Sequence, residues 1–152
     1  MKNVQTGKGE FSLKKALITV KGTQKNAQNE TDTIELITEG EFLKKGEYYY
    51  IKYDESELSG LDKTTTTLKV GEDSVILMRF GDNQSKMVFE KNTRHESNYV
   101  TPYGNIMLGV KSDEIKVNLT ENGGELKLKY AIDLDERVLS DNELHLTVRE
   151  VN

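Results

Sequence analysis

Arg79 is the charged side chain with the greatest chemical interest, because it interrupts an otherwise apolar stretch, ILMRFG, at residues 76–81. A buried arginine requires a carboxylate or a bound anion as its partner. The face that it occupies depends on the length of the hairpin loop that GDNQ, at 81–84, would close. A loop of two or four residues places Arg79 outside near Glu90, which is the interpretation we prefer. A loop of three or five residues places it inside with Phe89, where it would anchor a ligand.

Four tyrosines gather in one predicted strand, YYYIKY, and they must divide between its two faces. Because successive side chains of a strand alternate, Tyr48 and Tyr50 share one face, and Tyr49 and Tyr53 share the other. One of these two pairs must point to the inner face of the sheet. Inward phenol rings either line a ligand site, with the hydroxyl fixing orientation, or pack as core residues with a satisfied hydroxyl.

The only proline of the chain, Pro102, lies in the stretch YVTPYG at 99–104. Proline lacks an N–H and fixes φ, and Gly104 can take a positive φ, so the stretch predicts a turn between two antiparallel strands. Tyr99 and Tyr103 flank this turn and suit the rim of a barrel mouth. We expect Tyr103 to pack across the barrel end as a plug, in which case Tyr103→Ala lowers stability by about 3 kcal/mol. The strand after Gly104 is expected to be buried.

Signals of catalysis are sparse. The chain has no cysteine, which leaves no thiolate nucleophile or zinc ligand. His95 lies in a polar, loop-like segment and His145 on the wet face of the last predicted strand, and neither has a second histidine at a metal-ligand spacing. The acidic run at 54–57 is interpreted as a solvated loop. We therefore expect no catalytic residue, no metal site and no cofactor.

The composition is that of one globular domain. The chain has 152 residues, 35% of them hydrophobic and 31% charged, with a formal charge of −5 and no dense basic cluster. This charge disfavours nucleic acid and anionic membranes as partners. The absence of cysteine fits a reducing compartment, and the first apolar run, ALITV, is too short for a signal peptide, so we expect a cytoplasmic protein. Residues 1–11 are expected to be a mobile extension and 12–152 a single domain.

Apolar and polar residues alternate with a period of two along the chain, which predicts a protein built from strands. Segments rich in Gly, Asn and Asp separate the runs and predict sequential hairpins; they lie at 69–74, 80–85 and 120–124. The polar segment 22–33 is expected to be a mobile loop. The expected strands are 13–21, 33–39, 47–53, 63–70, 75–80, 86–91, one ending near 101, 105–111, 115–120, 126–134 and 144–148.

The fold class that this pattern predicts is all-β, with a single antiparallel barrel of about eight to ten strands in mostly meander topology. An open sheet would leave two unpaired edges, and the aromatic stretch YYYIKY would make a poor exposed edge. Closure of the sheet into a barrel pairs both of these edge strands. A barrel of about eight strands has an interior that side chains fill or that holds one small ligand.

The stretches YYYIKYDES, TTTTLKV, ILMRFG, YVTPYG and GELKLKYAIDL, in this order and at these intervals, resemble the YwiB-like family of uncharacterised bacterial proteins. The resemblance covers residues 12–150 and rests on strand and turn motifs. It implies a calycin-like, lipocalin-like barrel in the cytoplasm of Gram-positive bacteria, with no established activity. The chain lacks tryptophan, and hence the Gly-x-Trp of lipocalins, and it lacks the helical lid of fatty-acid-binding proteins. The resemblance therefore implies no lipid ligand.

Three functions are compatible with these features. We favour a non-enzymatic protein that binds a small, partly polar ligand at the barrel mouth. The alternative is a protein-interaction scaffold that uses the barrel rim or outer face, as a monomer or weak homodimer; a third is a small-molecule isomerase or hydrolase. The candidate ligand contacts are Tyr50, Arg79, Tyr99 and Tyr103.

Overall fold

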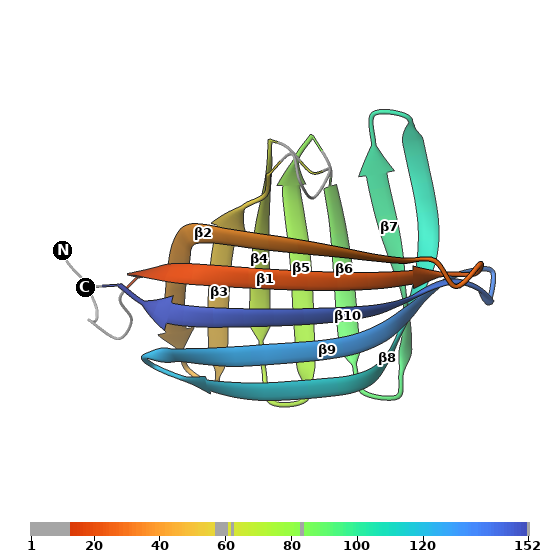
Figure 1. Ribbon diagram of the computed structural model, residues 1–152. Helices are drawn as coiled ribbons and strands as arrows, with labels where there is room; N and C mark the ends of the chain where they lie inside the picture. Colours follow the sequence, from red (N-terminus) through yellow and green to blue (C-terminus); the bar gives the residue numbers. More distant parts are fainter. Residues whose placement is uncertain (1–12, 57–60, 62, 83, 152) are drawn as a thin grey trace.

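The computed structural model describes residues 13–56, 61, 63–82 and 84–151, so the extension expected at 1–11 lies outside the described residues. In this part of the chain, ten strands form a closed antiparallel barrel (Figure 1). Each strand pairs with its neighbour in sequence, and the last pairs with the first, which confirms the predicted meander barrel. The strands are β1 (Lys14–Asn26), β2 (Thr31–Lys45), β3 (Tyr48–Asp54), β4 (Thr64–Val70), β5 (Ser74–Gly81), β6 (Gln84–Glu90), β7 (Arg94–Thr101), β8 (Gly104–Thr120), β9 (Gly123–Leu134) and β10 (Arg137–Glu150). No helix in the described segments is long and apolar enough to cross a membrane.

The aromatic strand β3 has both of its edges paired, with β2 on one side and β4 on the other. The sequence predicts this pairing, because such an apolar strand would make a poor exposed edge and a closed barrel has no unpaired edges. The alternation of its tyrosines is also confirmed: Tyr53 is buried inside, whereas Tyr48 is exposed on the outer face. Tyr49 stacks on the buried Phe42 with the ring centroids 5.8 Å apart, so it belongs to the inner set.

One half of the barrel interior is a continuous apolar core. Paired residues of antiparallel strands share a face, so the register can be followed around the wall. Ile51 pairs with Leu68, Leu68 with Leu77, and Leu77 with Met87, and all four are buried. The aliphatic residues of β1, β9 and β10 cover them from the opposite wall, where Ile18, Leu126, Leu128, Leu146 and Val148 are buried.

The polar segment 22–33 is not a loop, and that prediction is wrong. β1 continues to Asn26 and β2 begins at Thr31, so most of the segment is paired strand and only a short turn connects them. The Asn26 side chain caps the turn by accepting hydrogen bonds from the backbone N–H groups of Gln28 and Glu30. β10 also pairs with β1 as far as Asn26, and this second ladder gives a polar sequence the support that its composition alone does not reveal. The long hairpin extends the barrel wall (Figure 1).

β8 is one strand, although two were predicted in its place. A register shift against β9 between Ser112 and Glu114 marks a bulge at the position of the expected break. A bulge bends a strand and re-aims its side chains without ending the ladder. Ser112 is buried as a result.

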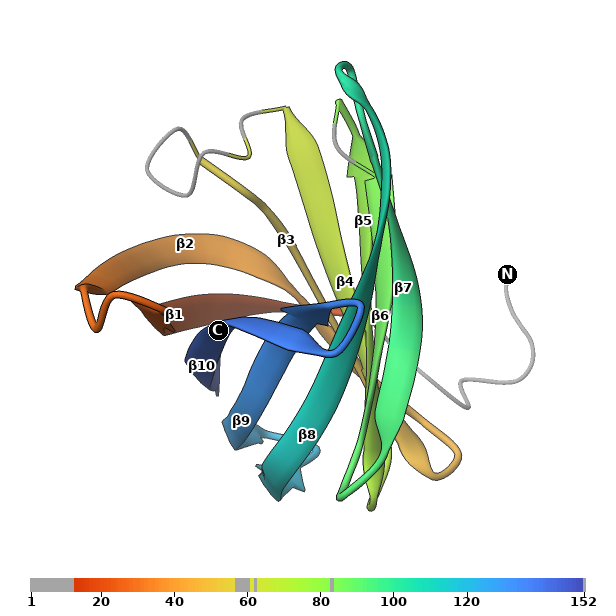
Figure 2. The same cartoon turned by 90° about the vertical axis from the view of Figure 1, so that its right-hand side faces the viewer.

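The turn at Pro102 confirms the predicted corner, but the expected plug is absent. Thr101 pairs with Gly104, whose φ is 131°, so Pro102 and Tyr103 form a two-residue hairpin connection. Tyr103 is 99% exposed, and Ile106 is 50% exposed where a buried strand was expected. The reason is visible in Figure 2, where the β7–β8 hairpin projects past the neighbouring strands. Tyr103→Ala should therefore change the stability by less than about 0.5 kcal/mol.

Candidate functional site

Arg79 lies inside the barrel, so the preferred outer placement is wrong and the alternative is correct. The register pairs Arg79 with Ser85 and Leu77 with Met87, which is the register of a three- or five-residue loop. Arg79 therefore shares the inner face with the buried Leu77. The sequence alone does not show whether this hairpin loop has an odd or an even number of residues, because both loop types accept a turn segment with Gly and Asn.

Arg79 belongs to a row of polar inner side chains that crosses five neighbouring strands. Tyr53 of β3 pairs with Thr66 of β4, Thr66 with Arg79, Arg79 with Ser85 of β6, and Ser85 with Tyr99 of β7. We call these five residues the Arg79 row. The adjacent row is the apolar one that contains Ile51 and Leu77, so the interior changes from hydrophobic to polar within one step along the strands.

A second polar row crosses the other five strands. Asp32 of β2 pairs with Gln24 of β1, Gln24 with Asn142 of β10, Asn142 with Tyr130 of β9, and Tyr130 with Ser112 of β8. We call these residues the Asn142 row. The Asn142 amide also donates to the Ser140 hydroxyl at 3.1 Å, and to the backbone carbonyl of Tyr130.

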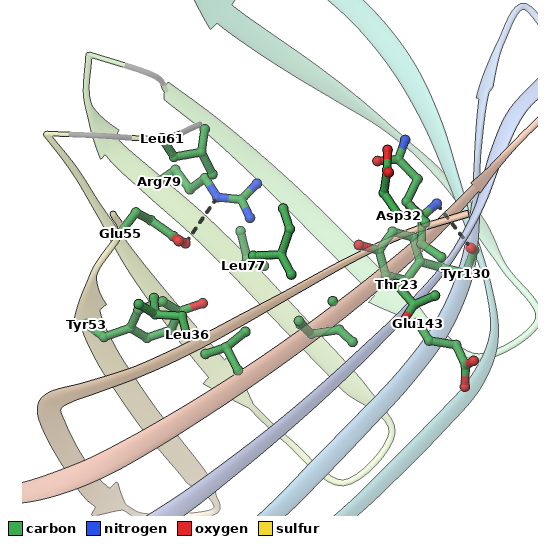
Figure 3. A pocket seen from close by; sticks show the side chains of 16 residues that line it. Thr23, Asp32, Leu36, Tyr53, Glu55, Leu61, Leu77, Arg79, Tyr130 and Glu143 are labelled. Atoms are coloured by element: carbon green, nitrogen blue, oxygen red, sulfur yellow. Dashed lines mark hydrogen bonds and ion pairs between the residues drawn. The ribbon is translucent and has the colours of Figure 1, made fainter. Parts of the chain in front are cut away.

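A cavity of about 180 Å³ lies between the two rows. The Arg79 row contributes Tyr53 and Arg79 to its lining, and the Asn142 row contributes Gln24, Asp32, Tyr130 and Asn142. Figure 3 shows Arg79 and Glu55 on one side of the cavity and Asp32 and Tyr130 on the other. The wall between these sides is apolar and includes Val20, Leu36, Leu77 and Leu144.

Glu55 is the charge partner of Arg79. Its carboxylate Oε2 lies 3.8 Å from Arg79 Nε, and its side chain is only 5% exposed, against 21% for Arg79. The same oxygen accepts a hydrogen bond from the Thr66 hydroxyl at 2.5 Å. Within the described part of the chain, Arg79 Nε is buried and has no hydrogen-bond partner. The guanidinium is thus compensated in charge by Glu55, toward which its Nε points, while the outer end of the group faces the cavity (Figure 3).

The three inner tyrosines report the electrostatics of this cavity. Burial is the main cause that raises the pKa values of Tyr53, Tyr99 and Tyr130 above the ordinary 10.0, and the pKa of Tyr130 reaches about 12. Glu55 adds to the rise in the pKa of Tyr53. Arg79 acts against the rise in all three pKa values, so its positive charge is felt on both sides of the cavity.

These raised pKa values predict a stability loss at alkaline pH. A pKa that is higher in the folded than in the unfolded state means that the folded protein holds more protons above about pH 10, so the free energy of unfolding falls as the pH rises through the folded pKa values. Phenolate absorbance should show three of the seven tyrosines ionising only as the barrel unfolds. Tyr130→Phe should reduce the number of tyrosines that ionise only on unfolding from three to two. Ionisation of all seven near pH 10 with the far-ultraviolet circular dichroism unchanged would contradict this assignment.

The four candidate contacts fall in different places. Arg79 and Tyr99 both belong to the Arg79 row, and the Tyr99 hydroxyl contacts the sulfur of Met87 at 2.9 Å. Tyr50 pairs with Lys69 on the outer face of β3, and Tyr103 is at the exposed hairpin tip. The structure thus brings Arg79 and Tyr99 into one row, but of the four only Arg79 lines the cavity.

Several residues of the site escaped the sequence analysis. Glu55 was assigned to a solvated acidic run, yet it is buried. Asp32 and Gln24 lay in the segment that was expected to be a loop, Asn142 carried no motif, and Tyr130 was noted only as part of the stretch GELKLKYAIDL. A signal did exist for Glu55, because Tyr53 was recognised as a candidate inner residue and Glu55 continues its face with a period of two.

The histidines do not form part of the cavity. His95 lies within β7, not in the predicted loop, and its Nε2 is 3.0 Å from a carboxylate oxygen of Glu90. His145 is exposed, with its Nε2 3.5 Å from a carboxylate oxygen of Glu125. Among the residues that the structure describes, no group of three or more His, Cys, Asp or Glu side chains is arranged to hold a metal ion.

Comparison with known proteins identifies the family but not an activity. Residues 18–146 match the family described as Domain of unknown function (DUF1934). The chain belongs to this family. A solved structure similar to it is the ywiB protein from Bacillus subtilis, with a TM-score of 0.83 and 21% identity over 95% of this chain and 97% of that one. At this identity the likeness of the DUF1934 chain to ywiB shows the fold alone. A search of curated proteins found no match.

Proposed function

We propose that this DUF1934 barrel binds a small, partly polar molecule in the cavity between the Arg79 and Asn142 rows. The observation that supports this most directly is the inward guanidinium of Arg79, which lines the cavity beside its charge partner Glu55. A guanidinium has five N–H donors, more than one carboxylate satisfies, so a bound ligand that supplies an acceptor gains hydrogen bonds at this group. We place this function in the cytoplasm, in line with the absence of cysteine.

The division of the barrel interior supports the same proposal. A barrel whose interior serves only for stability is filled by side chains throughout. Here the apolar core ends at the row of Ile51 and Leu77, and the next row is polar and borders a cavity of about 180 Å³. An apolar cavity of about 150 Å³ is large enough for benzene, so this one has room for a molecule of about one ring.

Gly22 offers a way to close the cavity without disturbing the barrel. It lines the cavity on the inner face of β1, and a Cβ added there meets nothing within 4 Å. We expect Gly22→Leu to fill the cavity and abolish ligand binding, while the stability stays equal or rises by up to about 1 kcal/mol. Ligands would be found by a thermal-shift screen of small molecules, and their affinities measured by calorimetry on both proteins.

Lys21→Leu is the matched control, because it adds the same side chain one residue away on the outer face. It should leave the affinity unchanged. Equal affinity in the Gly22→Leu protein would show that the ligand binds elsewhere, and a screen in which no compound shifts the melting temperature would count against the binding function itself.

A second candidate is an interaction scaffold, and the β7–β8 hairpin is the observation that favours it. Tyr103 is 99% exposed, Ile106 50% and Met107 52%, on a hairpin that projects past the neighbouring strands (Figure 2). Ile106 and Met107 lie on opposite faces of this hairpin, so both of its faces expose an apolar side chain of the kind that contacts other proteins. Retention of a partner by the native protein and its loss in Tyr103→Ser/Met107→Ser, with ligand binding unchanged, would support this function over the first.

A further inference from the structure

We infer that the ligand carries a primary ammonium group at one end and an uncharged hydrogen-bond acceptor at the other, joined by a short apolar segment. This inference rests on the proposed function and narrows it to a chemical class. It is carried by three features of the cavity: the compensated charge at the Arg79 side, the uncompensated charge at the Asp32 side and the apolar wall between them.

At the Arg79 side, the cavity requires an acceptor but no further negative charge. Glu55 is 5% exposed and already balances the guanidinium at 3.8 Å. A ligand carboxylate at this position would place two negative charges beside one positive charge in a buried site, and the desolvation of the extra charge is unfavourable. A carbonyl or amide oxygen accepts from the outer end of the Arg79 guanidinium without this penalty.

At the other side, Asp32 gives the cavity a negative charge that no cation offsets. Among the described residues, four charged side chains line the cavity: Asp32, Glu55, Arg79 and Glu143. Glu55 is offset by Arg79, and Glu143 by Lys129 with a carboxylate oxygen 3.8 Å from Lys129 Nζ. Among the ion pairs of the described residues, none includes Asp32. The charge that remains is therefore −1, located where β1 and β2 approach their turn.

The environment of Asp32 suits an ammonium group in particular. Its register neighbour Gln24 and the adjacent Asn142 carry amide oxygens, so an ammonium with three donors finds both charge and acceptors in this row. Asp32 is exposed, which keeps its carboxylate hydrated and its charge accessible at the cavity entrance. Figure 3 shows Asp32 well separated from Arg79, so one molecule must span the apolar wall to reach both.

The test uses three probes with the same six-carbon chain, and the second and third each differ from the first at one end only. ε-Aminocaproamide has the ammonium and the amide, caproamide lacks the ammonium, and ε-aminocaproate has a carboxylate in place of the amide. Affinities come from titrations followed by NMR, with the Arg79 Nε–H resonance as a reporter of ligand bound at the guanidinium. We expect ε-aminocaproamide to bind about fivefold more tightly than caproamide, the effect of an exposed ion pair, and more tightly than ε-aminocaproate. Both amides should shift the Arg79 Nε–H signal.

Two variants assign the two ends. Asp32→Asn should abolish the preference for the ammonium probe and leave the affinity for caproamide unchanged, whereas Glu35→Gln, on the outer face of the same strand, should alter neither. Arg79→Lys keeps the charge balance with Glu55 but removes the Nε–H and the planar fork. Arg79→Lys should lower the affinity for both amides by about tenfold and preserve the ratio of the two affinities.

The outcomes separate this inference from the function on which it rests. Equal affinities of the two amides, or tighter binding of ε-aminocaproate, would overturn the inference while leaving a ligand-binding cavity. Failure of all three probes to bind would also overturn it. The proposed function is judged separately, by whether any ligand from the thermal-shift screen is lost in Gly22→Leu.

Discussion

Replacement of Arg79 by leucine should lower the free energy of unfolding by about 3–5 kcal/mol, the largest effect of a single substitution in the cavity. The reason is that the substitution leaves the Glu55 carboxylate buried without its cation. Glu55 is only 5% exposed, and in the described residues its charge is balanced by Arg79 alone. Removing one member of a buried pair leaves an unpaired charge, which is more unfavourable than losing both members. Urea unfolding at neutral pH measures the effect.

The double variant Arg79→Leu/Glu55→Gln is the decisive comparison. Glutamine keeps an oxygen for the Thr66 hydroxyl and removes the charge. We expect most of the stability lost in Arg79→Leu to return, so the two substitutions are strongly non-additive. A loss below about 1 kcal/mol in Arg79→Leu would show that water screens the pair, as it does for surface ion pairs. Additive losses in the double variant would show that Arg79 acts by packing instead of by charge.

The pair also links the stability of this barrel to the binding function that we propose. Arg79 lies one row beyond the buried Leu77, at the border between the core and the cavity. A hydrophobic pair at this position would extend the core by one row and is often as stable as an ion pair. Retaining a charge pair with an unsatisfied N–H leaves a polar cavity where a core could have formed. The binding site that we propose would account for this charge pair, whereas stability alone does not.

The sequence was sufficient to predict the barrel because the evidence for it is local. The alternation in β9 and β10, the turn residues and the aromatic strand β3 each indicate paired strands within a few residues. The strands within the segment 22–33 were not predicted because its side chains are polar on both faces. Pairing with β10, more than a hundred residues away, is what orders the segment. Secondary-structure preferences do not contain such a long-range ladder.

The candidate site could be predicted only in part, because it depends on register. Arg79 was identified by its apolar neighbours, but its face depends on the parity of one hairpin loop. The Asn142 row joins Ser112 to Asp32 through four ladders, and a bulge between Ser112 and Glu114 sets the alignment of one of them. A shift by one residue in any ladder would turn these side chains outward. No short motif in the sequence carries that information.

Replacement of Phe89 by alanine should lower the free energy of unfolding by about 3–5 kcal/mol and also weaken ligand binding. Phe89 is fully buried in β6, and its ring meets the Tyr130 ring edge to face at a centroid distance of 4.8 Å. Tyr130 lines the cavity, so the core residue holds a cavity residue in place. Removing the ring leaves a void beside Tyr130 and frees it to rotate into that void.

Phe80→Ala provides the matched control, because Phe80 lies on the neighbouring strand β5 and is 57% exposed. It should change the stability by less than about 0.5 kcal/mol. Urea unfolding gives the stabilities, and calorimetry on the folded proteins gives the affinities for any ligand that Gly22→Leu excludes. Phe89→Leu, which keeps the core more nearly filled but removes the aromatic contact, separates the two effects. If Phe89→Leu binds ligand as tightly as the unaltered protein, the edge contact does not position Tyr130, and the core supports the cavity only by keeping the barrel folded.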